Sequence, residues 1–179
     1  MCKRSLWWLA LWLLASSLVL PAQHVPRAEA FFGYSYMRIQ IQGSTAVNSN
    51  GWNGELAGYF NRNVGVVADF SGHYPVSKGV DFSMYNFLFG PQVSYHGAAT
   101  LSPFARFLIG GTHASAGFGG QRAADTNFAF GFGAGVDAKV APAFALRLIQ
   151  ADYIRTHFLS HHQNQTRLSF GVVFRTGGR

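Results

Sequence analysis

The chain has 179 residues, the length of a single domain, and carries a formal net charge of +7. Only 12% of the residues are charged, whereas 16% are aromatic and 21 are glycine, a composition unlike that of most soluble domains. The basic residues are scattered singly along the chain without a Lys/Arg-rich cluster, which argues against a nucleic-acid-binding protein.

The first segment, residues 1–30, is predicted to be a cleavable signal peptide. Lys3 and Arg4 precede an uncharged apolar run over residues 6–20, which is shorter than the roughly 20 residues that a membrane-spanning helix needs. An uncleaved membrane anchor is the alternative.

Two short motifs offer a site for signal cleavage. Ala28-Glu29-Ala30 has the small-x-small pattern, Leu20-Pro21-Ala22 is a second candidate, and we take Phe31 as the approximate start of the mature chain. The mature domain would then be residues 31–179. Removal of Cys2, the only cysteine, leaves no disulfide, no thiol nucleophile and no cysteine metal site.

The remaining chain alternates large apolar side chains with small or polar ones at a period of two, as a β-strand with one apolar face does. The pattern is clearest where Phe128, Phe130 and Phe132 alternate with glycines such as Gly131 and Gly133. A soluble sheet would place polar side chains on the second face, whereas a narrow barrel with its apolar side turned to lipid needs small residues inside. Strands are predicted from Phe31 onward and over residues 52–60, 64–74, 83–95, 103–113, 127–136, 144–155 and 166–175.

The connections between these strands alternate in length. Longer polar stretches are predicted at residues 40–51, 75–81, 115–126 and 157–165, and short turns lie between the other strands. This asymmetry is typical of outer-membrane barrels, and an even strand number puts both termini in the periplasm. The sequence therefore predicts an all-β fold, an eight-stranded antiparallel up-and-down transmembrane β-barrel that follows a cleavable signal peptide.

Short motifs in a fixed order resemble the eight-stranded outer-membrane β-barrel family that is related to the OmpA transmembrane domain and includes porin-family outer-membrane proteins. They are Phe32-Gly33-Tyr34-Ser35-Tyr36, Ala68-Asp69-Phe70-Ser71-Gly72, Pro103-Phe104, Phe132-Gly133-Ala134-Gly135-Val136-Asp137, Arg147 with Asp152-Tyr153, and Leu168-Ser169-Phe170-Gly171-Val172-Val173-Phe174.

The resemblance implies a monomer in the outer membrane of a Gram-negative bacterium, without a cofactor. Its expected partners are outer-membrane lipids and lipopolysaccharide, with periplasmic chaperones and the barrel-assembly machinery during biogenesis. Family members usually end on the terminal aromatic residue, whereas residues 175–179 follow Phe174 here.

The inward faces of the predicted strands carry few but balanced charges. Such charges should pair, because an unpaired charge in a narrow lumen of low dielectric is very costly. One interpretation is a network that plugs the barrel and fixes strand register; the other is a narrow gated pore whose ion pairs exchange partners. The expected lumen network is Glu55, Asp69, Arg106, Asp137, Arg147 and Arg167, and the expected lipid-facing residues include Phe128, Phe130, Phe132, Phe170 and Phe174.

An enzymatic alternative is a lipid A acyl hydrolase, since some eight-stranded outer-membrane barrels have that activity. His113 and Ser115 have the His-x-Ser spacing, which places both on one strand face, and Asp125 lies across the same predicted loop. The residue after Ser115 is not the Asn of that deacylase family, and the family's acid is Glu. The chain is therefore predicted not to be an enzyme.

Three further interpretations are weighed against the barrel. His157, His161 and His162 share a predicted loop, but no Cys or carboxylate accompanies them, so no metal site is predicted. A soluble lipocalin-like binder would need its bulky apolar residues inside. A small-solute porin remains an alternative to the predicted structural, envelope-integrity or surface-interaction role.

Overall fold

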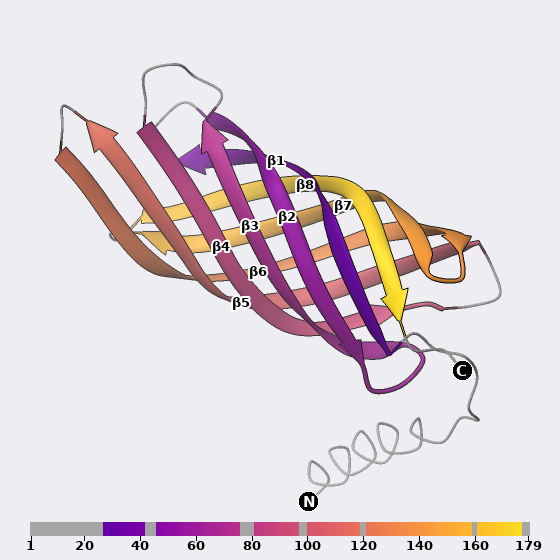
Figure 1. Ribbon diagram of the computed structural model, residues 1–179. Coiled ribbons are helices and arrows are strands. Elements are labelled where there is room, and N and C mark those ends of the chain that lie inside the picture. Colours follow the sequence, from indigo (N-terminus) through magenta and orange to yellow (C-terminus); the bar gives the residue numbers. More distant parts are fainter. Residues whose placement is uncertain are drawn as a thin grey trace, which may run out of the picture.

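The computed structural model describes residues 27–41, 46–75, 81–96, 100–118, 121–158 and 161–176, which form a closed barrel of eight antiparallel strands. Each strand pairs with its neighbours in chain order, and the last strand closes the barrel on the first (Figure 1). Within this part of the chain, no helix is long and apolar enough to span a membrane. The strands are β1 (Ala28–Ile41), β2 (Val47–Tyr59), β3 (Val64–Pro75), β4 (Asp81–Ser94), β5 (Leu101–Phe118), β6 (Gln121–Ala141), β7 (Phe144–Phe158) and β8 (His161–Thr176).

The two ends of the barrel differ. At one end, here called the terminal end, Ala28 pairs with Thr176, and the turns β2–β3, β4–β5 and β6–β7 lie at the same end. The strand ends that flank the other four connections lie at the opposite, distal end. The ribbon shows both β1 and β8 reaching the terminal end side by side (Figure 1).

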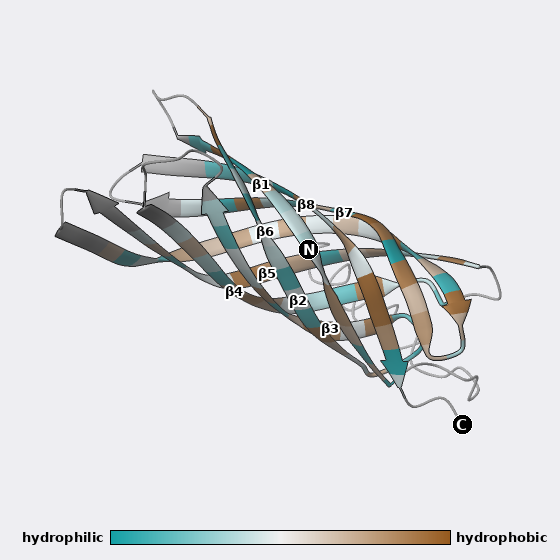
Figure 2. Ribbon diagram, turned by 45° about the horizontal axis from the view of Figure 1, so that its top comes forward, coloured by the Kyte–Doolittle hydropathy of each residue, from teal (hydrophilic) through white to brown (hydrophobic). Residues whose placement is uncertain are grey.

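The alternation of side chains along each strand sets what is inside and what is outside. Phe128, Phe132 and Phe170 are 62, 59 and 56% exposed on the outer face, whereas their neighbours point into the lumen. Polar and apolar residues therefore alternate along the ribbons (Figure 2). The inner face is buried even though it carries many polar residues, because the barrel encloses it.

Glycines on the inner face make room for the larger side chains of neighbouring strands. A side chain at Gly133 would collide with the carboxylate of Asp152, and one at Gly135 would lie 2.5 Å from the ring of Phe104. The small residues seen in β6 are thus required by what the lumen contains.

A β-bulge in β7 explains an irregularity of the sequence. Leu148 and Ile149 are consecutive yet both exposed, at 54 and 53%, and the pairing with β8 shifts between Arg147 and Gln150. Strict alternation would put Arg147 and Asp152 on opposite faces. The extra residue reverses the alternation, so that both side chains point into the lumen.

The distal parts of the strands are longer than the sequence pattern predicts. The expected loop at residues 115–126 is mostly paired strand, since Ser115 pairs with Ala124 and Phe118 with Gln121. The expected loop at 157–165 is likewise strand on both sides, with Phe158 paired to His161. The predictions were wrong because backbone pairing continues beyond the apolar band, where alternation no longer signals it.

Two further features refine the sequence prediction. β1 begins at Ala28, three residues before the expected mature start, while residues 1–26 lie outside the described part.

Pro91 lies exposed on the outer face opposite Val66 of β3, and the β4–β5 ladder omits Gly90 and Pro91 without a register shift. The missing N–H of Pro91 thus interrupts one ladder locally.

The bulge predicts that both of its side chains contact hydrocarbon. We expect Leu148→Arg and Ile149→Arg each to lower the free energy of unfolding by up to about 2–4 kcal/mol, the cost of a cation on the lipid face near the bilayer centre. Guanidinium titration of protein refolded into vesicles measures this cost, with Asn63→Arg at an exposed position of the β2–β3 turn as the control. Clearly unequal costs for the two variants would contradict a bulge that turns both side chains outward.

Candidate functional site: the buried charge network

The lumen holds a network of seven charged side chains that come from six of the eight strands. Each has at most 4% of its surface exposed. We call this set the lumen network: Glu55 of β2, Asp69 of β3, Arg106 of β5, Asp137 of β6, Arg147 and Asp152 of β7, and Arg167 of β8. The structure brings together all six residues expected from the sequence and adds Asp152.

Arg147 forms one half of the lumen network. Its Nε donates to Asp137 Oδ1 at 2.8 Å, and its Nη1 donates to Glu55 Oε2 at 2.5 Å. The guanidinium carbon lies 4.4 Å from the ring centre of Phe31 and 4.3 Å from that of Phe104. Two aromatic faces thus hold the planar cation while its edge binds two carboxylates.

Arg106 and Arg167 form the other half around two shared carboxylates. Arg106 Nε and Nη2 donate to Asp152 Oδ1 at 2.9 Å and Asp69 Oδ2 at 3.0 Å, and its Nη1 lies 2.7 Å from Glu55 Oε1. Arg167 Nη2 donates to the same Asp69 oxygen at 2.6 Å, and its Nε donates to Asp152 Oδ2 at 3.0 Å. Glu55 therefore connects the two halves.

Neutral side chains complete the hydrogen bonding of these ions. Gln150 accepts from Arg147 Nη1 at 2.6 Å and donates through Nε2 to Glu55 Oε1 at 2.8 Å and Asp152 Oδ2 at 2.9 Å. Ser71 accepts from Arg167 Nη1 at 2.9 Å. A buried ion pair needs partners for its remaining donors and acceptors, and these contacts supply several of them.

A second polar cluster, here called the terminal clasp, joins strands at the terminal end. Its centre is the carboxylate of Glu29, which accepts from Tyr59 Oη at 2.8 Å and Arg175 Nε at 2.7 Å and lies 3.1 Å from His96 Nε2. The other ring nitrogen of His96, Nδ1, lies 2.8 Å from the carbonyl oxygen of Arg62. Arg175 Nη2 also reaches Asp137 Oδ2 at 3.4 Å, which links the clasp to the lumen network.

Sequence reasoning does not place five charged or aromatic members of these clusters, among them His96, which falls in a predicted turn. Asp152 cannot share a face with Arg147 without a bulge, so the sequence leaves the register of β7 after Ile149 open, and Glu29 falls within the expected signal peptide. Arg175 follows the final aromatic residue, and Tyr59 lies near the end of a predicted strand, where aromatic rings are also common at a membrane interface. The alternation itself could have indicated Tyr59. It lies two and four residues after the inward residues Ala57 and Glu55 and therefore shares their face of the strand.

Apolar side chains fill the lumen beside the ions. One buried cluster includes Met37, Leu88, Leu108 and Ile154, and a second consists of Phe31, Ala145 and Val173. Because these side chains and the ions are almost fully buried, the described part of the lumen is packed rather than open.

The three residues of the acyl-hydrolase hypothesis do not form a catalytic chain. The His113 ring bonds Thr126 Oγ1 at 2.8 Å, and Ser115 Oγ bonds Ser83 Oγ at 2.8 Å. Asp125 instead accepts from the backbone N–H of Thr126 at 2.8 Å and from the side chain of Asn127 at 3.3 Å. Base, nucleophile and acid are each bonded to another neighbour.

No group of three or more potential metal ligands occurs among the described residues. The side chains of His157, His161 and His162, which the sequence analysis considered, lie outside that set.

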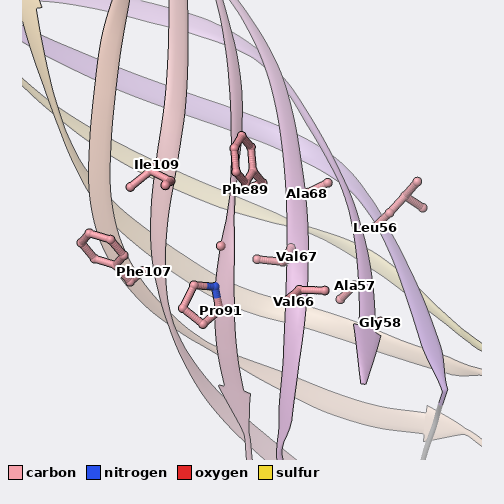
Figure 3. A pocket seen from close by; sticks show the side chains of 11 residues that line it. Leu56, Ala57, Gly58, Val66, Val67, Ala68, Phe89, Pro91, Phe107 and Ile109 are labelled. Carbon is pink, nitrogen blue, oxygen red and sulfur yellow. The ribbon is translucent and has the colours of Figure 1, made fainter. Parts of the chain in front are cut away.

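A shallow hollow of about 750 Å³ lies on the outer face over β2–β5. Figure 3 shows the apolar side chains that surround it, including Leu56, Val66, Phe89, Phe107 and Ile109. Small residues between them leave the space, and no charged or hydrogen-bonding side chain lines it. The hollow therefore lacks the groups that chemistry would need, and in a membrane it would accept hydrocarbon.

Comparison with known proteins agrees with this geometry. A family model described as the outer membrane protein beta-barrel domain matches residues 9–175. The chain belongs to this family. Membership places the protein in the outer membrane as a small β-barrel.

Solved structures share the fold at low sequence identity. Neisserial surface protein A is 14% identical with a TM-score of 0.73, over 83% of this chain and 97% of that one. Ail, the attachment invasion locus protein of Yersinia pestis, is 21% identical with a TM-score of 0.58, over 84 and 99% of the two chains. OprG from Pseudomonas aeruginosa is 10% identical with a TM-score of 0.57, over 88 and 99%. No curated protein sequence matches the chain significantly.

The lumen network predicts a large penalty for removal of a single member. Arg167→Ala leaves Asp69 and Asp152 buried with fewer donors, so we expect a loss of about 3–5 kcal/mol in the free energy of unfolding. Denaturant titration of the refolded barrel measures it. Arg155→Ala is the matched control, because Arg155 lies on the neighbouring strand β7 without a described ion pair. The free energy of unfolding of this variant should stay within about 0.5 kcal/mol of the wild-type value. Equal effects of the two variants would contradict the role assigned to the network.

Proposed function

We propose that the protein is a non-enzymatic outer-membrane barrel with a structural, envelope-integrity or surface-interaction role, and that its lumen is a plug rather than an open channel. The observation that carries this proposal is the lumen network, in which Glu55, Arg106 and Arg147 join the two halves across the barrel. Each network side chain is buried, so solute passage would require several ion pairs to separate together.

The barrel shape also supports a surface role at the distal end. Both termini would face the periplasm and the four distal connections would face outward, in keeping with the usual orientation of such barrels. The β5–β6 and β7–β8 hairpins continue as paired strands on this side. Side chains on these paired strands could form a surface that contacts a partner.

The same proposal includes the expected partners and processing. The outer face would contact outer-membrane lipids and lipopolysaccharide, and the chain would act as a monomer. Periplasmic chaperones and the barrel-assembly machinery would deliver it after a signal peptide within residues 1–30 directs export. A lipocalin-like soluble binder does not fit, because Phe128, Phe130 and Phe132 point outward and the ions point inward.

A narrow gated pore is the second candidate, since charged groups line the centre of the lumen. In planar bilayers we expect the purified protein to give no stable conductance steps at moderate voltage, because the lumen network stays closed. Conductance steps in the wild-type protein that disappear in Arg147→Ala would favour the pore over the plug. Additions of detergent without protein give the background conductance for comparison.

The geometry around Ser115 predicts no acyl transfer. Overexpression of the wild-type protein should leave the lipid A profile unchanged by mass spectrometry, and Ser115→Ala should give the same profile, because His113 and Ser115 bond other side chains. Loss of an acyl chain with the wild-type protein but not with Ser115→Ala would show the enzymatic interpretation to be correct.

A further inference from the structure

The terminal clasp bears on where the mature chain begins. The backbone of Arg27 is already part of the barrel wall: its N–H donates to the carbonyl of Thr176 at 2.9 Å, and its carbonyl accepts from the N–H of Tyr59 at 3.0 Å. Ala28, Glu29 and Ala30 then pair on both sides, with β2 and with β8. These residues belong to the closing strand.

The Glu29 side chain matters to the fold as much as its backbone does. Its carboxylate is 5% exposed and receives hydrogen bonds from Tyr59 of β2 and Arg175 of β8, while His96 approaches from the end of β4. The ring of His96 lies between two oxygen atoms, one from Glu29 and one from the Arg62 carbonyl. One carboxylate thus connects four parts of the barrel.

Cleavage after Ala30 would remove this carboxylate from the mature protein. Arg175 would keep only its 3.4 Å contact with Asp137, and His96 would lose its anionic neighbour. The backbone of Phe174 and Arg175 in β8, and of Ala57 and Gly58 in β2, would lose their partners in β1. A buried cation without its partner and open strand edges are both strongly unfavourable.

We propose that signal cleavage occurs before Arg27, at the Leu20-Pro21-Ala22 motif, and that Glu29 is a structural residue of the mature barrel. This inference rests on the proposed export of the chain. The motif begins at the last residue of the uncharged run of residues 6–20 and ends two residues after it, where a cleavage site is expected. The small-x-small pattern at Ala28-Glu29-Ala30 is instead part of β1.

The N-terminal peptides of the mature protein test the cleavage site directly. Protein purified from outer membranes is digested with trypsin, which cuts after Arg27 and Arg38, and the peptides are identified by mass spectrometry. We expect an N-terminal peptide of residues 23–27 together with the full peptide 28–38. A semi-tryptic peptide of residues 31–38 without 28–38 would overturn the inference and leave export intact. A peptide of residues 5–27 as the main N-terminal product would instead refute cleavage itself, and with it the signal peptide of the proposed function.

Substitution of Glu29 supplies a second readout. Glu29→Gln should lower the midpoint of the heat-induced mobility shift on gels by about 4 °C or more, because Arg175 and His96 lose an anionic acceptor. Arg38→Gln, on the same strand and exposed, is the matched control and should not shift the midpoint. If residues 28–30 are removed during export, mature Glu29→Gln protein is identical to the wild type and the midpoint cannot change, which would contradict the inference.

Discussion

The structure depends on the pairing of charges inside a narrow, closed lumen. Four acids and three arginines occupy a space from which water is largely excluded, and each ion reaches at least one partner of opposite charge. Since a lone buried ion is far more costly than a pair, every strand that contributes an ion must hold its register. The network therefore specifies which residues face inward on six strands at once.

The outer face obeys the opposite condition. Hydrocarbon offers no hydrogen bonds, so the backbone must pair internally and the side chains that face lipid must be apolar. Closure of β8 on β1 gives the backbone groups of both strands hydrogen-bond partners, and the exposed phenylalanines of β6 and β8 make the outer face apolar. Inside, the glycines of β6 accept the bulk of Asp152 and Phe104 from β7 and β5. Apolar surface and polar centre are thus two results of one alternating pattern.

Much of the fold follows from the sequence, because a period of two identifies both the strands and their faces. The strand number, the chain-order pairing and the inward direction of Glu55, Asp69, Arg106, Asp137 and Arg167 agree with the pattern. Where alternation is interrupted or ends, the pattern no longer predicts which face a residue lies on or where the strand stops. It leaves the register of β7 after Ile149 open, and it stops at the distal ends of β5–β8, where pairing persists without an apolar face.

The site is less predictable because its contacts join residues that are far apart in the chain. Asp69 and Arg167 bond across the lumen, and Glu29 bonds Arg175 through closure of the first strand on the last. No local signal shows that an acid beside the expected cleavage motif belongs to the barrel. Only the three-dimensional register shows that Glu29 and Arg175 are directly paired in adjacent strands.

The extended β5–β6 hairpin has a consequence for recognition at the distal end. Because its backbone is already paired up to Phe118 and Gln121, a partner that docks there need not order a flexible segment first. Association would then lose less conformational entropy than binding to an unstructured loop of the same length. It would also favour partners whose shape complements a stiff, twisted ribbon.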